Sequence, residues 1–311
     1  MLFGLLLYCL DQAVASLLSS NRPLDYRSFV ESRKSFFTRN STPKVLFIGD
    51  SHVADAINTK VLDSILKTES YNLGVYHASP FDNYYVLKKV IDRGLVPKVL
   101  ALGTNYTMFY RKAEPSKYIP IILSDFKSRT ELVLNSTKGF EPGIFIESLN
   151  EKYLLDAILN SFRGIPYKPT RDIESVYNGS LVFKNQSENV EWKYKPNKKS
   201  LIQISTEQVS YFRRIIQLAQ EKGIKVVILN PPIWKEKLVG LQRFSSQFHD
   251  CDSILTIVAK EFGVPIYNRD YQTMNSILVR QDFLDAEHLN WNGAVKYTVD
   301  FSRWFAGSQE L

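Results

Sequence analysis

The sequence predicts a three-layer α/β/α protein built on a doubly wound, mainly parallel five-stranded sheet. Three observations carry this prediction: short apolar runs rich in strand formers, amphipathic helical segments between them, and polar residues where the runs end. Continuous apolar runs are typical of strands buried on both faces of a parallel sheet, and their alternation with helices implies right-handed crossovers. The expected strands are residues 44–48, 72–76, 98–102, 225–229 and 264–267.

Amphipathic helices are expected between these strands. The clearest spans residues 53–67, where Val53, Ile57, Val61 and Ile65 recur at four-residue intervals and so lie on one face. Active sites of such sheets lie at the carboxyl ends of the strands, which is where the unusual polar residues of this sequence collect. The other expected helices are residues 83–93, 206–222, 253–262 and 292–305.

The α/β domain is expected to span residues 44–305, with a large insertion at about 106–203. An insertion of this length is far too long for a simple crossover loop. It carries an amphipathic helix over residues 146–162 and then becomes rich in Asn and Lys. We interpret it as a segment that caps or lines the substrate site, with structural padding as the alternative.

Residues 1–20 begin with an almost wholly apolar run that Asp11 interrupts. A membrane-spanning helix needs about 20 apolar residues, so we expect a signal peptide cleaved near residues 13–15, or part of a membrane anchor. A buried N-terminal helix is the alternative, and the basic residues that follow argue for a cytoplasmic body. We favour export or anchoring, with residues 21–43 as a linker containing a short helix and the body on the extracytoplasmic face (periplasm or cell surface).

The net charge of +7 favours anionic partners. The charge is spread along the chain, and its densest patch is four lysines between residues 193 and 199. Neither a zinc-finger pattern nor an RNA-binding signature accompanies it, so nucleic acid is not an expected partner. Cys9 lies in the apolar N-terminal run, and Cys251 is therefore the one thiol of the folded body, without an internal disulfide.

Ser51 is the candidate nucleophile. It directly follows the first expected strand and opens a helix, so its backbone N–H lies at a helix N-terminus, where the dipole favours negative charge. Acyl transfer needs such a hydroxyl, a base that deprotonates it and a group that orients the base. A lone serine at this position is more typical of a helix N-cap, so the assignment depends on its partners.

Those partners are expected near the C-terminus, where Asp285 precedes His288 by three residues on a loop before the last helix. This spacing lets the carboxylate reach one ring nitrogen and leaves the other to face a serine. Glu287 is the alternative orienting acid, but adjacent residues usually point apart, so we favour Asp285. A surface turn with no catalytic role is the structural alternative.

Two more residues are candidates for binding the oxyanion that develops during acyl transfer. Asn105 ends the third strand, and its side-chain amide can donate a hydrogen bond there. Gly74 lies at the second strand and can offer its backbone N–H, because no side chain blocks close approach. Ordinary turn residues are the alternative for both.

Together these blocks resemble the GDSL/SGNH hydrolase superfamily, over residues 44–105 and 206–305. Two positions depart from the family pattern: His52 stands where Leu is commoner, and Tyr106 where Asp usually follows. The four matching blocks are Gly49-Asp50-Ser51, Gly74, Gly103-Thr104-Asn105 and the D-x-x-H stretch from Asp285 to His288.

The resemblance implies an SGNH or flavodoxin-like sheet and a role for each matched residue. Ser51 would be the nucleophile, His288 the base and Asp285 its orienting acid. The backbone N–H groups of Ser51 and Gly74 and the side chain of Asn105 would form the oxyanion hole.

The resemblance also implies a function. The branches most similar in style are envelope acyl-transfer proteins, like those that acetylate alginate or D-alanylate teichoic acids. A serine esterase or O-acyltransferase acting through an acyl-serine on a cell-envelope glycan, or a similar acylated and anionic substrate, is therefore expected. A membrane-bound acyl donor would be its partner, and neither a cofactor nor a metal is expected. The sequence does not decide between a hydrolase and a transferase, because the two differ only in whether water reaches the acyl-serine.

Two other classes of function stay open. Asp50 and His52 form a D-x-H motif that would suit a metallophosphoesterase. The chain has four histidines, however, and lacks the later ligand blocks of such two-metal sites. A catalytically inactive glycan-binding or scaffold protein is the other alternative, since a triad in sequence is a hypothesis about geometry.

Overall fold

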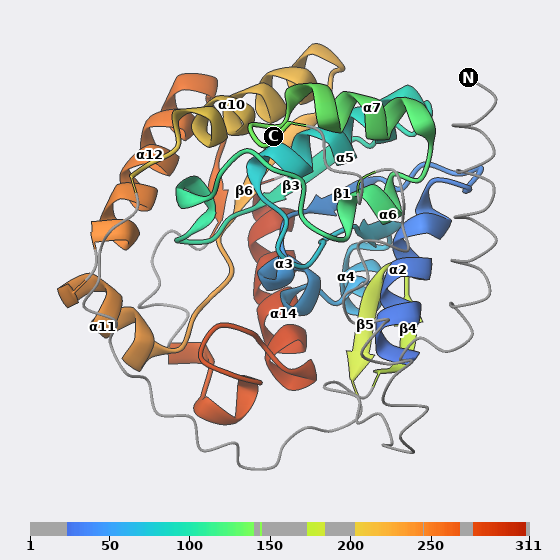
Figure 1. Ribbon diagram of the computed structural model, residues 1–311. Helices are drawn as coiled ribbons and strands as arrows, with labels where there is room; N and C mark the ends of the chain where they lie inside the picture. The colour runs from blue at the N-terminus through green and yellow to red at the C-terminus, as the bar shows by residue number, and fades with distance from the viewer. Residues whose placement is uncertain are drawn as a thin grey trace, which may run out of the picture.

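A five-stranded parallel sheet forms the centre of the protein (Figure 1). Its strand order is β2-β1-β3-β6-β7, and every neighbouring pair runs parallel, which confirms the predicted fold class. The strands are β1 (Val45–Ile48), β2 (Ser70–Asn72), β3 (Val99–Gly103), β6 (Lys225–Leu229) and β7 (Ile266–Tyr267). The computed structural model describes residues 24–139, 144, 173–183, 203–244, 246–267 and 276–308.

The strand order reverses between β1 and β3. The chain passes from β1 to β2 on one side, and then crosses β1 to reach β3 on the other. In open α/β sheets ligands bind at such a switch point, outside the carboxyl ends of the strands. Ile48 pairs with Leu102, and Gly103 pairs with Leu229. The ends of β1, β3 and β6 therefore meet at one edge of the sheet.

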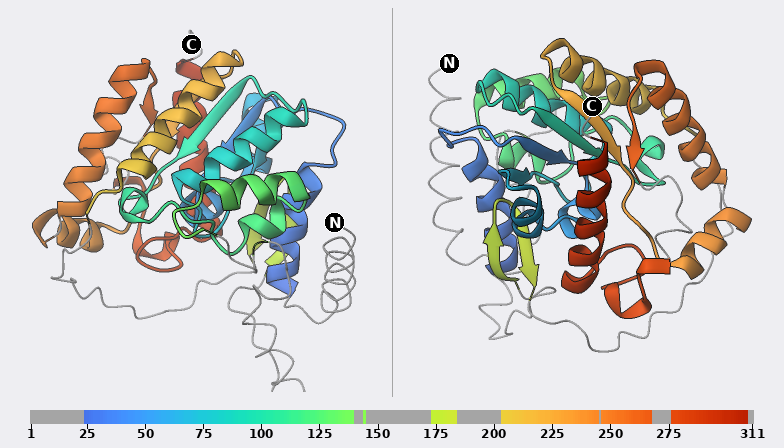
Figure 2. Two further views of the ribbon diagram at one scale, coloured as in Figure 1. Left: turned by 45° about the horizontal axis from the view of Figure 1, so that its top comes forward. Right: turned by 180° about the vertical axis from the view of Figure 1, so that it is seen from behind.

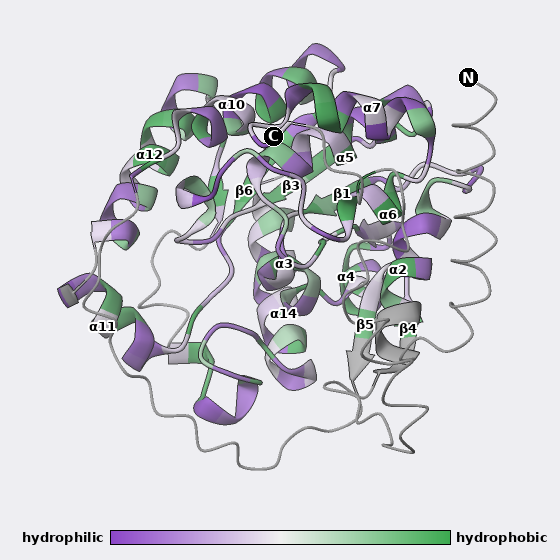
Figure 3. Ribbon diagram, viewed as in Figure 1, coloured by the Kyte–Doolittle hydropathy of each residue, from purple (hydrophilic) through white to green (hydrophobic). Residues whose placement is uncertain are grey.

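Alternate residues of each strand face opposite layers of helices. In β1, Leu46 and Ile48 lie in one apolar core, and Val45 and Phe47 lie in the other. Figure 2 shows α14 on the side of the sheet away from α5 and α10, and Figure 3 shows the apolar strands between them. The first core is covered by α2 (Leu24–Phe36), α5 (Pro80–Asp92), α10 (Thr206–Glu221) and α12 (Ser246–Phe262). The second is covered by α3 (Ser51–Ala56), α4 (Thr59–Leu66) and α14 (Trp291–Gly307).

The helix expected over residues 53–67 is in fact two helices, α3 and α4. The side chain of Asn58 accepts the N–H of Val61 at 3.2 Å and so begins a new helix. The break changes the helical phase: Leu62 is buried, whereas Ile65 is 44% exposed. The four-residue spacing of apolar residues continues across the break between α3 and α4. In the sequence, only the capping residue Asn58 marks where the second helix begins.

β2 lies earlier than expected, at Ser70–Asn72 rather than residues 72–76. The N–H groups of Leu73 and Val75 still donate to carbonyl oxygens of the β1 segment, at 2.8 and 2.9 Å. The pairing therefore continues beyond the regular strand and carries the chain to the edge where β1 ends.

A short helix was predicted within the linker at residues 21–43, and residues 24–36 form helix α2. This helix packs into the folded body, which the prediction of a linker did not include. Phe29, Val30 and Phe36 are buried, and Arg33 is fully buried. The guanidinium of Arg33 donates to the carbonyl oxygen of Gly74 at 3.0 Å. The mixed polar composition of the segment had hidden its apolar face. The apolar segment at residues 1–20 lies outside the described residues, and none of the described helices is long and apolar enough to cross a membrane.

Part of the insertion is described. A hairpin turns at Asn178 and Gly179, both with positive φ (42° and 80°), as tight hairpin turns require. The helix expected over residues 146–162 lies outside the described residues, as does the lysine patch. Within the insertion lie η1 (Met108–Tyr110), α6 (Ile119–Ile122), α7 (Phe126–Asn135), β4 (Ile173–Tyr177) and β5 (Ser180–Phe183), and elsewhere lie α11 (Lys235–Phe244) and η3 (Arg280–Asp282).

Candidate active site

Ser51 lies where β1 gives way to α3. Two glycines make this junction tight: a Cβ on Gly49 would lie 2.4 Å from Cγ2 of Val53, and a Cβ on Gly103 would lie 1.8 Å from the same atom. The helix therefore begins directly against the ends of β1 and β3. As the first residue of α3, Ser51 has a backbone N–H without a partner within the helix.

The imidazole of His288 connects Ser51 to Asp285. Its Nε2 lies 2.9 Å from Oγ of Ser51, and its Nδ1 lies 2.9 and 2.8 Å from the two carboxylate oxygens of Asp285. In this arrangement the ring can take the hydroxyl proton while the acid fixes its tautomer and orientation. The structure thus brings together the three residues proposed as a triad, although 237 positions separate Ser51 from His288.

The loop before α14 holds Asp285 in place. One oxygen of its carboxylate accepts the N–H groups of Glu287 and His288, at 2.8 and 2.9 Å. The N–H of Leu284 donates to the carbonyl oxygen of His288 at 2.8 Å, and Asn290 then caps α14. The acid and the base are therefore set by backbone hydrogen bonds of one compact loop.

Glu287, the alternative orienting acid, points elsewhere. Its carboxylate accepts a hydrogen bond from the Tyr106 hydroxyl at 3.0 Å and pairs with the ammonium of Lys237. Burial lowers the pKa of Lys237 to about 8, although the charge of Asp285 opposes that shift. Tyr106 directly follows the Gly103-Thr104-Asn105 block, but no role was predicted for it, and no local sequence pattern links Lys237 to the site.

A second acid–histidine pair lies beside the first. Nδ1 of His52 lies 3.1 Å from both carboxylate oxygens of Asp50. Nε2 of His52 is buried without a hydrogen bond, 3.7 Å from the nearer oxygen of Glu287. Burial alone would raise the pKa of Asp50, but His52 and the charge of Arg111 outweigh it and hold that pKa below its ordinary value.

Asn105 is held by hydrogen bonds at both ends of its amide. Its Nδ2 donates to Asp50, and its Oδ1 accepts the backbone N–H and the hydroxyl of Thr107, at 2.7 and 2.8 Å. An amide nitrogen carries two protons, so one is left after the bond to Asp50. The sequence located Asn105 correctly at the end of β3, and the structure adds the two residues that fix its orientation.

Gly74 does not fit the role expected of it. Its N–H donates to Oδ1 of Asn72 at 2.9 Å, so this single proton is not directed at a substrate. The structure gives another reason for glycine, since a Cβ here would lie 2.6 Å from the backbone nitrogen of Ala54. The glycine lets the second loop lie directly against α3, and its proposed place in the oxyanion hole is not supported.

Asn72 is the residue that sequence reasoning missed here. Its side-chain nitrogen donates to the carbonyl oxygens of Val53 and Ile57, at 3.0 and 3.2 Å. It thereby ties the end of β2 to the helix that carries Ser51. The sequence contained one signal for it, an Asn at the start of an expected apolar strand. A buried asparagine in such a strand needs hydrogen-bond partners.

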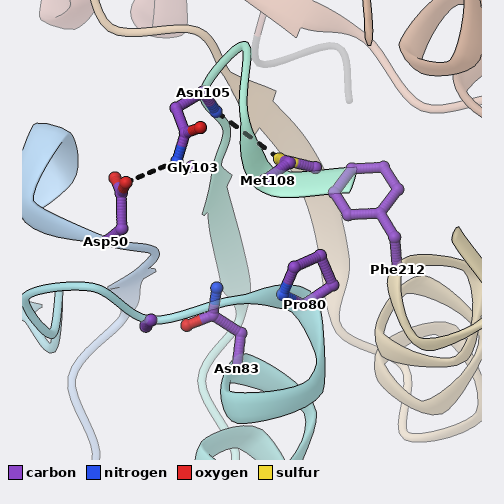
Figure 4. A pocket seen from close by; sticks show the side chains of 8 residues that line it. Asp50, Pro80, Asn83, Gly103, Asn105, Met108 and Phe212 are labelled. Atoms are coloured by element: carbon purple, nitrogen blue, oxygen red, sulfur yellow. Dashed lines mark hydrogen bonds between the residues drawn. The ribbon is translucent and has the colours of Figure 1, made fainter. Parts of the chain in front are cut away.

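A small pocket is lined in part by Asn105 (Figure 4). Asp50 and Asn105 form its polar side, and Oδ1 of Asn83 is buried there without a hydrogen-bond partner. The remaining lining is formed by Ala78, Pro80, Gly103, Met108 and Phe212. Such a cavity suits a small, partly polar occupant such as an ordered water.

Comparisons with known proteins find similarity in structure rather than in sequence. No protein-family model matches the chain, and no curated protein matches it in sequence. Among solved structures, a lipase/acylhydrolase from Enterococcus faecalis is similar over 85% of this chain and 96% of its own length, at 12% sequence identity and a TM-score of 0.38. Within the described ranges, no group of three or more His, Cys, Asp or Glu residues is arranged to hold a metal ion.

Proposed function

We propose that the protein is a serine esterase or O-acyltransferase, with Ser51 as the nucleophile, His288 as the base and Asp285 as its orienting acid. The observation that carries the proposal is the continuous contact from the Asp285 carboxylate through the imidazole of His288 to Oγ of Ser51. Nucleophile, base and orienting group in hydrogen-bond reach of one another are the signature of covalent acyl transfer.

The reaction follows from these contacts. His288 accepts the proton of the Ser51 hydroxyl at Nε2 as Oγ attacks the carbonyl carbon of an ester. When the tetrahedral intermediate collapses, the ring returns that proton to the departing alcohol and an acyl-serine remains. Water or a sugar hydroxyl then gives its proton to His288 as its oxygen attacks the acyl-serine. When the bond between the acyl group and Oγ breaks, His288 returns the proton to Oγ of Ser51, so hydrolysis and transfer use the same triad.

The negative charge of the intermediate would be stabilised by two donors. The N–H of Ser51 lies at the start of α3, where the helix dipole favours an anion. The amide of Asn105, already oriented by Asp50 and Thr107, supplies the second. Donors held in place before the reaction stabilise the oxyanion without reorganisation.

An acylated, anionic glycan of the cell envelope is the substrate class we propose, with a membrane-bound acyl donor if the enzyme is a transferase. The basic net charge and the apolar residues 1–20 support an extracytoplasmic enzyme of this kind. The insertion, which lies beside the site at η1, would then decide whether water or a sugar reaches the acyl-serine.

Mass spectrometry after incubation with 4-nitrophenyl acetate tests the nucleophile. We expect an added acetyl group on the peptide that contains Ser51, and none in the Ser51→Ala variant. Cleavage that survives in Ser51→Ala but stops with a chelator would instead favour metal-dependent chemistry. If the wild type forms no adduct and cleaves no ester, while both proteins bind glycan equally, the inactive binder is the better description.

A further inference from the structure

Two carboxylates of the catalytic loop lie near the histidines of the site. Nδ1 of His288 contacts the two oxygens of Asp285 at 2.9 and 2.8 Å, whereas the nearer oxygen of Glu287 lies 3.7 Å from Nε2 of His52. That separation is too long for a hydrogen bond, although this buried nitrogen has no hydrogen-bond partner among the described residues. A small movement of Glu287 would therefore give His52 a second carboxylate partner.

Lys237 and Tyr106 hold the other oxygen of Glu287. The ammonium of Lys237 pairs with Oε1 of Glu287, and the Tyr106 hydroxyl donates to the same oxygen at 3.0 Å. The ammonium also lies 5.3 Å from the centroid of the Tyr106 ring, within the range of a cation–π contact. Two donors from separate segments of the chain therefore fix Oε1, while Oε2 stays beyond hydrogen-bond reach of His52.

The lysine that makes this ion pair is buried. Lys237 is 8% exposed, and lysine is almost never buried unless it is paired. Removing two charges from water costs free energy, so a buried ion pair is weak evidence for a gain in stability. In some proteins such pairs are retained because they fix one arrangement over its alternatives. Here the alternative arrangement is the contact between Glu287 and His52.

The segment that carries Lys237 is fixed against the catalytic loop. The N–H of Trp234 donates to the carbonyl oxygen of Ala286 at 3.0 Å. The indole of Trp234 also packs against the ring of Phe283, with ring centroids 5.5 Å apart. Helix α11 begins at the next residue, beside this loop (Figure 1). The helix therefore brings the Lys237 ammonium to the loop in a fixed position.

A change at His52 would also affect the catalytic base. The rings of His52 and His288 lie against each other, with centroids 5.0 Å apart, and Nδ1 of His52 lies 3.1 Å from both oxygens of Asp50. Glu287 also directly precedes His288 in the chain. A Glu287 carboxylate that moved to His52 would therefore disturb two acid–histidine pairs at once.

We propose that Lys237 is a positioning residue that selects the orienting acid of the site. Its ion pair with Glu287 keeps this carboxylate from His52, and so leaves Asp285 to orient the catalytic base. Tyr106 adds an uncharged donor to the same carboxylate. The inference rests on the proposed function, and Lys237 acts in it through Glu287 rather than on the reacting atoms.

Kinetics with 4-nitrophenyl acetate test this role. Lys237→Met leaves Glu287 charged but without its cation, so we expect kcat to fall about 5-fold or more with little change in KM, as for coupled residues in contact. In the Glu287→Gln background the same substitution should change kcat less than about 2-fold, because the competing charge is already gone. Lys235→Met is the control, since Lys235 lies on the same helix and is exposed. No fall in the wild-type background, or an equal fall in both backgrounds, overturns the proposal.

NMR of the histidine rings gives a readout that does not depend on turnover. The chain has four histidines, so their ring resonances can be assigned by single substitutions. We expect the His52 resonances to move in Lys237→Met, and to stay in place when Lys237→Met is added to Glu287→Gln. Tyr106→Phe, which removes the uncharged donor, should move them in the same direction by less. If thermal unfolding shows that Lys237→Met does not fold, Tyr106→Phe decides, and resonances that stay in place overturn the proposal.

Two outcomes separate this inference from the proposed function. Ester cleavage and an acyl-serine in the wild type, with no loss of kcat in Lys237→Met, would overturn the role of Lys237 and leave the esterase intact. A shift of the His52 ring that depends on Glu287, in a protein that cleaves no ester and forms no acyl-serine, would support the role of the ion pair and overturn the esterase.

Discussion

The imidazole rings of His52 and His288 lie against each other, with centroids 5.0 Å apart and planes inclined by 31°. Two acid–histidine pairs therefore flank Ser51, but only His288 reaches its hydroxyl. His52 instead faces Asp50 at one nitrogen and Glu287 at the other. We infer that His52 is a positioning residue, which supports Asp50 and, through it, the amide of Asn105.

Replacing His52 by Leu, the residue commoner at this motif position, tests that role. The substitution leaves the buried carboxylate of Asp50 without its main partner, at a cost of about 1–3 kcal/mol. We expect kcat/KM for 4-nitrophenyl acetate to fall about 10- to 100-fold if that cost appears in the transition state. His249→Leu is the control, because His249 is exposed and contacts a backbone carbonyl of α11. Unchanged kinetics in His52→Leu would show that His52 only fills space.

The choice between the two acids of the catalytic loop is open to a direct test. Asp285→Asn removes the charge that stabilises the imidazolium of His288 and favours the wrong tautomer, so we expect kcat to fall about 10⁴-fold. Glu287→Gln should cost less than about 10-fold, since Glu287 contacts Tyr106 and Lys237 rather than the catalytic ring. Steady-state kinetics of the two variants decide, and a reversed order would assign the orienting role to Glu287.

Asn105→Ala tests the proposed oxyanion donor. Removing one such donor typically lowers kcat by about 10²- to 10³-fold with little change in KM. The same substitution frees Asp50 and Thr107 from the amide, so thermal unfolding should be measured alongside. Thr107→Val is the control for that effect, because it loses one hydrogen bond to Asn105 but leaves the donor in place. Equal losses of kcat in the two variants would argue against a direct role for the amide.

The sequence predicted the sheet well because its strands are buried on both faces, and burial on both faces leaves an uninterrupted apolar run. It also located Ser51, Asp285 and His288, since each lies next to a recognisable boundary between elements. The use of the Gly74 N–H by Asn72 could not be read from the sequence, because that hydrogen bond depends on how a loop meets a helix. The same holds for Lys237, which approaches the site from a distant helix.

The stability of the protein should depend on the ionisation of Asp82. Its carboxyl is buried and accepts the N–H groups of Ser79 and Ser116, at 2.8 and 3.0 Å, and burial raises its pKa to about 7. Between about pH 4 and 7 the folded state therefore holds a proton that the unfolded chain has lost. Stability from this group is complete at acid pH and declines as the pH rises, by up to about 1.4 kcal/mol per pH unit.

Urea unfolding of wild type and Asp82→Asn across pH 4.5 to 7.5 measures this dependence. We expect the difference in unfolding free energy between the two proteins to shrink as the pH rises, because the amide does not ionise. The substitution also changes the hydrogen bonds from the N–H groups of Ser79 and Ser116 at every pH. We therefore expect a constant difference in unfolding free energy in addition to the part that depends on pH. Parallel curves over the whole range would contradict a raised pKa at Asp82.

The β4–β5 hairpin of the insertion supports the helix that carries Ser51. Alanine substitutions at two glycines, one in the hairpin and one outside it, test that support. Gly179 and Gly139 both have positive φ (80° and 74°), but a Cβ on Gly179 would lie 2.0 Å from the carbonyl oxygen of Asn72, whereas a Cβ on Gly139 meets nothing within 4 Å. Alanine at Gly139 should cost only the backbone strain, about 1 kcal/mol.

Gly179→Ala should cost more than Gly139→Ala in thermal unfolding, because the hairpin must move away from β2. It should also lower kcat, since Asn72 holds the carbonyl groups at the end of α3 through its side chain. Ser180 anchors the same hairpin by donating to the carbonyl oxygen of Ile57 at 2.8 Å, so Ser180→Ala should shift kcat in the same direction without a clash. Equal melting temperatures and equal kcat in the two glycine variants would show that the hairpin does not position the nucleophile.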